Sequence, residues 1–215
     1  MALATGNRVA SKRATKPAED TPHSSLDARA RILLYSSNIW YLGEGMFGPL
    51  LAVFSGMIGG DILDITWVWA AYLVVGGVCT VLTGYVSDRY VRKEVLLVSG
   101  FALNTLFTFG YLFVDSAGDL LLIQVGLGVA SALATPTWDA LYAEGDTETS
   151  CGLRWGLAGG QAEILTGVAI LLGGLIVTHV SFSALFIAMG TLQAIATVYQ
   201  AQILRTSHKN VSLSR

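Results

Sequence analysis

The sequence predicts an all-α membrane protein with six transmembrane helices. Of its 215 residues, 53% are hydrophobic and only 13% are charged, a composition far from that of an ordinary soluble domain. A bilayer core about 30 Å thick requires about 20 apolar residues per helical span. Six stretches of about this length contain no lysine or arginine and lack the two-residue alternation typical of membrane β-barrel strands. These predicted spans are 32–54, 65–87, 95–114, 120–142, 155–177 and 182–204.

The first span, 32–54, carries a polar stripe along an otherwise apolar helix. Its polar residues share one face by i, i+3, i+4 spacing, so this face is expected to meet protein or water rather than lipid. Pro49 lacks a backbone donor and allows the span to bend. The stripe consists of Ser37, Tyr41, Glu44 and Gly48.

The second and third spans contain no formal charge. In the second span, Gly76, Thr80 and Gly84 recur every four residues, a small-residue row that predicts close contact with another helix. In the third, the neutral Asn104 lies about 15 Å past Glu94 at 1.5 Å per residue, which places it near the bilayer midplane.

The fourth and fifth spans each contain one acid, and the sixth contains none. Asp139 lies about one turn from the end of the fourth span and is expected to be interfacial. Glu163 lies about 13 Å beyond Arg154, near the midplane. Because an acid inside a bilayer is costly, Glu44 and Glu163 are candidates for substrate or ion handling. The alternative is a structural acid, protonated or bonded to neighbouring helices.

The basic residues predict the orientation of the chain. All thirteen lysines and arginines lie before the first span, after the second, fourth and sixth spans, and nowhere else. The alternate loops, 55–64, 115–119 and 178–181, contain none. Under the positive-inside rule, both termini are expected in the cytoplasm, and the protein is expected to be integral to the cell (inner) membrane.

The segments outside the spans carry no recognisable domain. Residues 1–28, rich in Pro, Ser, Thr and charge, are expected to form a disordered cytosolic tail; their basic opening also mildly resembles an organelle transit sequence. The transmembrane domain is expected over 29–204, with a second cytosolic tail at 205–215. No nucleotide-binding glycine motif occurs, and the three histidines are scattered, so neither a cofactor nor a metal site is expected.

The loop after the second span carries a motif. Residues 84–93 read GYVSDRYVRK, which is similar to the pattern G-x-L-A-D-R-x-G-R-K of the major facilitator superfamily (MFS), with Val91 in place of the second glycine. This loop resembles the one between helices two and three of that family, and the resemblance extends over about 32–204, the N-terminal six-helix half. The matching residues are Gly84, Asp88, Arg89, Arg92 and Lys93.

A second set of residues resembles the family around the fourth and fifth helices. The residues that match are Pro136, Ala140, Glu144, Arg154 and Gly156. Two departures weaken a proton-antiporter interpretation. Leu122 stands where the fourth-helix pattern has arginine. The fifth-helix pattern G-P-x-x-G-G keeps Gly173 and Gly174 but has Ala169 and Ile170 for its Gly-Pro.

The resemblance implies one MFS-like six-helix bundle that takes part in secondary active transport of a small solute by alternating access. It also implies that Asp88 closes a cytoplasmic gate by meeting the positive end of a helix in the other half. Alternatively, Arg89, Arg92 and Lys93 only fix the topology and contact lipid head groups. The candidate substrate- or ion-binding residues are Tyr41, Glu44, Asn104, Gln161 and Glu163; the two amides could instead serve only as interhelical bonds.

The expected partners are membrane lipid, a small-molecule substrate, and either a second copy of the chain or a separate six-helix half; no nucleic acid is expected. The two halves of a family member share one orientation, so a parallel homodimer could reproduce their arrangement. Its central cavity is expected to be lined by Tyr41, Glu44, Asn104 and Glu163 of both chains. With acids and no basic residue, such a cavity favours a cationic or neutral polar solute, or proton symport, over an anion.

Two rival interpretations come from other classes of protein. A non-transporting membrane scaffold or receptor would have the same spans, and so would a truncated transporter remnant. An enzyme is not expected, because the sequence contains neither a Gly-x-Ser nucleophile with an intramembrane histidine nor the paired aspartates of a membrane protease.

Overall fold

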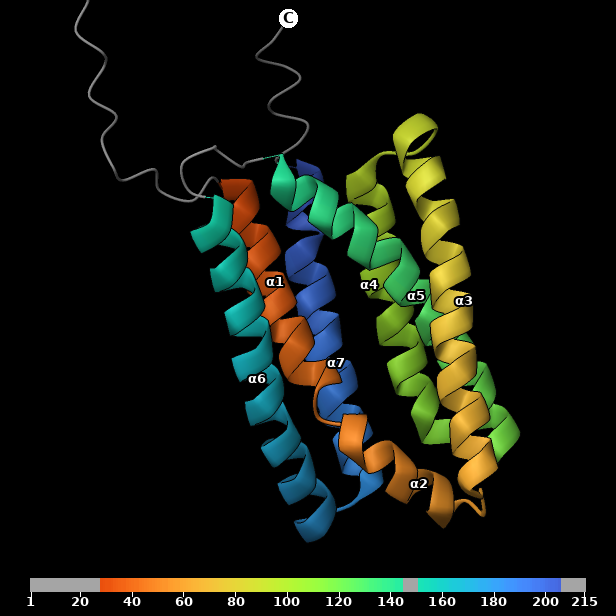
Figure 1. Cartoon of the computed structure of the whole chain (residues 1–215). Helices are drawn as coiled ribbons and strands as arrows, with labels where there is room; N and C mark the ends of the chain where they lie inside the picture. Colours follow the sequence, from red (N-terminus) through yellow and green to blue (C-terminus); the bar gives the residue numbers. More distant parts are fainter. Residues whose placement is uncertain (1–27, 145–150, 206–215) are drawn as a thin grey trace, which may run out of the picture.

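The computed structural model describes residues 28–144 and 151–205, and in these ranges the chain is helical and contains no strand (Figure 1). Ala28 and Arg205 are already helical; the rest of both predicted tails lies outside the described residues. The elements are α1 (Ala28–Glu44), the 3-10 helix η1 (Gly48–Leu50), α2 (Leu51–Met57), α3 (Ile62–Arg89), α4 (Lys93–Gly110), the 3-10 helix η2 (Tyr111–Phe113), α5 (Ala117–Ala143), α6 (Cys151–His179) and α7 (Phe182–Gln200).

Five helical segments in the described ranges are long and apolar enough to cross a membrane. They coincide with the second to sixth predicted spans. Three of them begin at a capping side chain. The Asp61 side chain accepts a hydrogen bond from the Asp64 backbone N–H at the start of α3, and Ser116 and Ser181 cap the starts of α5 and α7 in the same way. The five segments are Ile62–Arg89, Lys93–Phe113, Ala117–Ala143, Cys151–His179 and Phe182–Arg205.

The first predicted span is not one continuous helix, contrary to the sequence-based prediction. α1 ends at Glu44 after 17 residues, and a turn through Phe47 leads into η1, where Pro49 occupies the first turn. Glycine is a poor helix former and proline cannot bond back to the preceding turn, so the sequence Gly-Glu-Gly-Met-Phe-Gly-Pro ends the helix. Gly48 therefore belongs to a different helix from the rest of the predicted polar stripe.

The turn after α1 is held by close packing on α6. A Cβ atom on Gly45 would lie 3.0 Å from the Ala169 Cβ atom and 3.1 Å from the Thr166 Cα atom. The turn itself is closed by a hydrogen bond from the Gly45 N–H to the Tyr41 carbonyl at 3.0 Å. The break therefore has a fixed conformation within the bundle.

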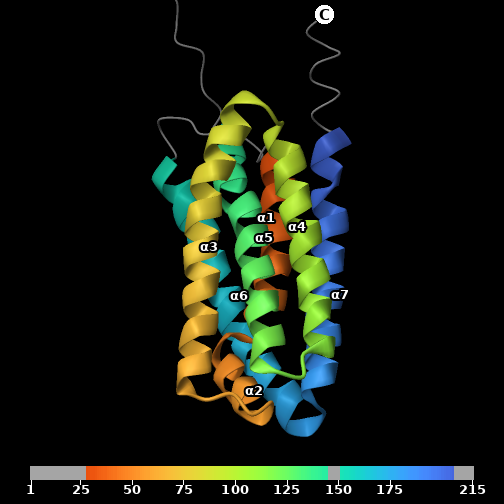
Figure 2. The same cartoon turned by 90° about the vertical axis from the view of Figure 1, so that its right-hand side faces the viewer.

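The helices form two groups that meet along α4 and α7. α5 packs against both α3 and α4, and α1 packs against both α7 and α6; Figure 2 shows α5 between α3 and α4. α3 and α6 lie at opposite sides of the bundle (Figure 1) and expose most of their apolar side chains. α1 begins and α7 ends at one end of the bundle, and α2 lies at the other (Figure 1).

Glycines allow close helix contacts, as the small-residue row of the second span predicts in part. A Cβ atom on Gly128 of α5 would lie 2.7 Å from the Tyr72 carbonyl oxygen and 3.2 Å from the Gly76 nitrogen of α3. Gly76 thus lies at a tight crossing of α3 and α5. Gly84, by contrast, faces open space in the described structure.

Aromatic side chains close the bundle at the α2 end. The Tyr111 and Phe186 rings stack with centroids 5.0 Å apart, and Phe47 packs edge-on against Phe186 at 5.2 Å. Phe54 of α2 adds a further edge contact with Phe186 at 5.0 Å. All four side chains are buried, so the polar positions of α1 lie on the other side of a packed apolar layer.

Candidate functional site

A cavity of about 390 Å³, named cavity A, lies between α1 and α5. Two carboxylates, Glu44 and Asp139, belong to its lining. No lysine or arginine is among the described residues that border it. Its aromatic lining residues are Trp40, Tyr41, Phe101 and Trp138.

A smaller cavity of about 230 Å³, named cavity B, lies toward the aromatic layer. Asn104, buried on α4, borders it together with Gln124, whose side-chain N–H donates to the Tyr111 hydroxyl at 3.0 Å. Glu44 borders both cavities. The acid at the end of α1 therefore stands at the junction of the two spaces.

The break in α1 determines the electrostatics at Glu44. The C-terminal end of a helix carries a partial negative charge from carbonyl groups without helical partners. Glu44 is the last residue of α1, and its carboxylate accepts a hydrogen bond from the indole N–H of Trp40. A negative side chain thus adds to the negative end of the helix dipole, an arrangement that favours a positive charge nearby.

The other predicted binding residues do not all meet at these cavities. Tyr41 borders cavity A and Asn104 borders cavity B. Gln161 accepts a hydrogen bond from the Asn38 side chain at 3.1 Å and thereby links α6 to α1. Glu163 is exposed on α6 and borders neither cavity. Within the described bundle, the structure thus brings Glu44 together with Tyr41 and Asn104, whereas Gln161 and Glu163 lie apart.

Asp139 and Trp138 are cavity residues that the sequence interpretation missed. Asp139, which was expected to be interfacial, is exposed and borders cavity A four residues before the end of α5. A signal for it exists in the sequence, because Ser131, Thr135 and Asp139 recur every four residues and share one helical face. All three border cavity A.

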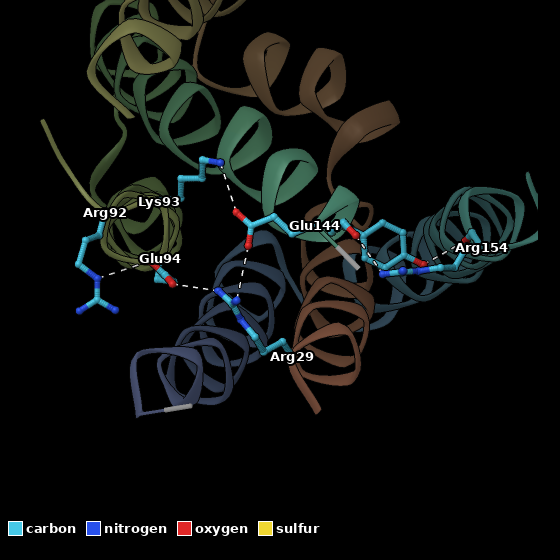
Figure 3. Close-up of polar contacts among 7 residues, drawn as sticks. Arg29, Arg92, Lys93, Glu94, Glu144 and Arg154 are labelled. Carbon is cyan, nitrogen blue, oxygen red and sulfur yellow. Dashed lines mark hydrogen bonds and ion pairs between the residues drawn. The ribbon is translucent and has the colours of Figure 1, made fainter. Parts of the chain in front are cut away.

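An ion-pair cluster joins the helices at the end of the bundle where α1 begins (Figure 3). Arg29 of α1 contacts Glu94 of α4 at 2.9 Å and Glu144, at the end of α5, at 3.5 Å. Arg92 lies 3.6 Å from Glu94, and Lys93 lies 3.3 Å from Glu144. These five residues, named the Arg29 cluster, connect segments that are far apart in the sequence.

The predicted gate motif divides into residues with and without partners in the bundle. Arg92 and Lys93 belong to the Arg29 cluster. The Arg89 guanidinium lies 4.6 Å from the centre of the Tyr85 ring and donates to its hydroxyl. Asp88 is exposed and has no hydrogen bond or ion pair with any residue of the described ranges. Its carboxylate is therefore available to a group outside the bundle.

Arg154 and Tyr142 connect the facing ends of α5 and α6 (Figure 3). The Arg154 guanidinium donates to the Tyr142 carbonyl oxygen at 2.9 Å, and the Tyr142 hydroxyl donates to the Arg154 carbonyl oxygen at 3.0 Å. The guanidinium also lies 4.6 Å from the centre of the Tyr142 ring, a cation–π geometry. This reciprocal pair fixes where α6 starts relative to α5.

Replacing Glu94 by glutamine is expected to destabilise the bundle by about 2 kcal/mol, because the Glu94 side chain is only 10% exposed and compensates both Arg29 and Arg92. The matched change Glu144→Gln removes an acid whose side chain is 45% exposed and should cost less than about 1 kcal/mol. Thermal unfolding in lipid nanodiscs measures both. Equal losses for the two variants would contradict the role given to Glu94.

The fold and the site define a helical membrane protein with an acidic, aromatic-lined cavity between α1 and α5. A model of the Major Facilitator Superfamily matches residues 33–213. The chain belongs to this family of membrane transporters, as the loop motif predicts. It is also similar to an uncharacterized MFS-type transporter of Methanocaldococcus jannaschii, with 24% identity over 157 residues that cover 73% of this chain and 40% of that protein. The chain thus spans about two fifths of the length of this relative.

Proposed function

We propose that this chain forms one bundle of a secondary transporter that moves a small solute by alternating access. The observation that carries the proposal is the position of Glu44, an exposed acid at the junction of two partly open cavities and at the break of a helix. Discontinuous helices at the midplane form the substrate and ion sites of many transporters. Family membership supports transport and argues against an enzyme.

The proposed topology has six crossings with both termini in the cytoplasm. α1, η1 and α2 together form the first, interrupted crossing, and the five long apolar helices form the others. The one-sided distribution of all thirteen basic residues supports this orientation. The Arg29 cluster would then face the cytoplasm.

An uptake assay that does not require the substrate to be known in advance tests the proposed transport. Proteoliposomes are incubated with an isotope-labelled cell extract under an imposed pH gradient, and the labelled solutes inside are identified by mass spectrometry. At least one solute should accumulate above the level in protein-free liposomes. If none accumulates with the gradient in either direction, the scaffold, receptor or remnant interpretation is favoured instead.

A second bundle is needed for alternating access, and we propose that it is another copy of this chain in a parallel homodimer, or else a separate six-helix half. Asp88 supports the homodimer, since its carboxylate is exposed and unpaired among the described residues. By analogy with the family, Asp88 of one copy should lie near the start of α6 of the other. There it would meet the positive end of that helix dipole, next to Gly156.

Disulfide crosslinking should therefore join Asp88→Cys of one copy to Gly156→Cys of the other, in a background where Cys79 and Cys151 are replaced by alanine. A Cβ atom on Gly156 has open space around it, so the new cysteine is accessible. The expected product is a covalent dimer on denaturing gels.

The matched control for this crosslink pairs Asp88→Cys with Gly174→Cys. Gly174 also faces open space but lies toward the other end of the same helix, so no crosslink is expected. A crosslink between residues 88 and 156 that forms only within one chain would contradict the proposed homodimer. Native mass spectrometry of the protein expressed alone distinguishes a dimer from a monomer that requires a separate half.

A further inference from the structure

We propose that cavity A binds a monovalent organic cation, such as a protonated or quaternary amine, an inference that rests on the proposed transport function and names the substrate class of its site. Three features of the cavity carry it: its charge, its aromatic lining and its size. The charge disfavours an anion, the aromatic lining disfavours a bare metal cation, and the volume suits a small organic molecule.

The charge of cavity A excludes an anion. Glu44 accepts a hydrogen bond from Trp40 but has no ion pair with a described residue, and Asp139 has neither a hydrogen bond nor an ion pair within those ranges. No lysine or arginine of the described ranges, those of the Arg29 cluster included, borders the cavity. Carboxylates inside a membrane domain are normally paired or belong to a substrate pathway. The negative end of α1 adds to this field.

The aromatic lining favours an organic cation over an inorganic one. Trp40 and Phe101 lie with ring centroids 4.2 Å apart, and Trp138 is held by stacking on Tyr142 at 4.7 Å and by a hydrogen bond from its indole N–H to the Leu33 carbonyl oxygen at 3.3 Å. Trp40 and Phe101 are buried against each other, so Tyr41 and the fixed Trp138 are the aromatic side chains that remain accessible to a ligand. An alkylammonium group binds such faces by cation–π attraction, whereas a small metal cation requires a shell of oxygen ligands.

Several hydroxyl groups of the cavity already have partners within the protein. Besides the two acids, its hydroxyl-bearing residues are Ser37, Tyr41, Ser131, Thr135 and Thr166. The Ser37 hydroxyl donates to the Leu33 carbonyl oxygen, and Ser131 and Thr135 lie within 3.5 Å of each other. These hydroxyls are thus partly satisfied already. The volume of about 390 Å³ lies within the range of small-molecule sites, about 300–1,000 Å³.

The test is equilibrium binding to the purified protein in lipid nanodiscs, with empty nanodiscs as the blank. The probes are three cations of increasing size: tetraethylammonium, benzyltrimethylammonium and tetraphenylphosphonium. The comparison ligands are the neutral benzyl alcohol and the anionic phenylacetate. At least one cation is expected to bind saturably, and neither comparison ligand should compete with it.

Three substitutions assign the binding to cavity A. Glu44→Gln and Asp139→Asn should each weaken cation binding by about tenfold or more. Trp138→Leu should do the same, whereas Trp138→Phe, which keeps an aromatic face, should stay within about threefold of the unchanged protein. Asp115→Asn, an exposed acid outside the cavity, serves as the matched control. Each variant is first checked for a monodisperse elution profile.

The possible outcomes separate this inference from the proposed function. No saturable binding of any of the three cations overturns it, and so does binding that Glu44→Gln and Asp139→Asn both leave unchanged. Uptake of a neutral or anionic solute without cation binding overturns the inference and leaves transport standing. Saturable cation binding without solute uptake overturns transport and leaves the cavity assignment in place.

Discussion

Replacing Glu44 by glutamine is expected to reduce solute uptake by about 100-fold or more. The variant keeps the size and the Trp40 contact of the side chain but removes the charge at the junction of the two cavities. The carboxylate is the proposed partner of a cationic solute, and loss of one partner of such a pair, once the bound solute excludes water, costs about 2–5 kcal/mol; about 2.7 kcal/mol corresponds to 100-fold. Initial uptake rates in proteoliposomes, normalised to the amount of inserted protein, measure the effect.

Two further variants control for a general loss of activity. Glu44→Asp retains the charge on a shorter side chain and should recover part of the uptake. Asp115→Asn changes an exposed acid in the loop before α5 and should leave uptake within about twofold, as expected for a surface substitution. The proposed role of Glu44 is wrong if Glu44→Gln and Asp115→Asn transport equally well.

The second large effect is expected on stability, from Gly173→Val. A Cβ atom at Gly173 of α6 would meet the backbone of Met46 in the turn after α1, with the Met46 carbonyl carbon at 2.9 Å and its Cα at 3.0 Å. Backbone atoms cannot move aside as a flexible side chain can, so the substitution forces α6 away from the turn. Overpacking of this kind costs about 1–3 kcal/mol or more.

Gly174→Val is the matched control for this substitution. Its Cβ atom would meet nothing within 4 Å, so the free energy of unfolding should change by less than about 0.5 kcal/mol. Thermal unfolding followed by tryptophan fluorescence in detergent compares the two. A similar loss in both variants would mean that the contact between α6 and the turn does not hold the bundle together.

The long helices could be predicted from the sequence because bilayer thickness dictates their length. The predicted span 65–87 corresponds to α3, Ile62–Arg89, and the predicted span 182–204 to α7 with the turn that follows. The interruption of the helix within 32–54 was not predicted, because a hydropathy pattern counts apolar residues and does not weigh backbone conformation. Glycines and Pro49 end α1 there, and close packing on α6 stabilises the break.

The candidate site could be predicted only where one residue is unusual for its segment of the sequence. Glu44 is identifiable because an acid in an apolar span is costly. Asp139 was assigned to the interface from its distance along the chain, since only the rotation of α5 turns its face toward α1. The Arg29 cluster could not be predicted either, because it joins three helices, α1, α4 and α5, whose paired residues lie far apart in the sequence: Arg29 and Glu94 are 65 residues apart, and Lys93 and Glu144 are 51 apart.

The helices that neighbour α1 determine how late in synthesis the packing of the bundle can be completed. α1 is the first described helix to leave the ribosome, yet it packs mainly against α7 and α6, the last two. With 17 residues, α1 is also shorter than the five described helical segments that are long and apolar enough to cross a membrane. Nascent chains acquire structure from the N-terminus onward. Here, however, α1 meets its main neighbours only after α6 and α7 have been made, so we expect a chain truncated before α6 to leave the inward face of α1 uncovered.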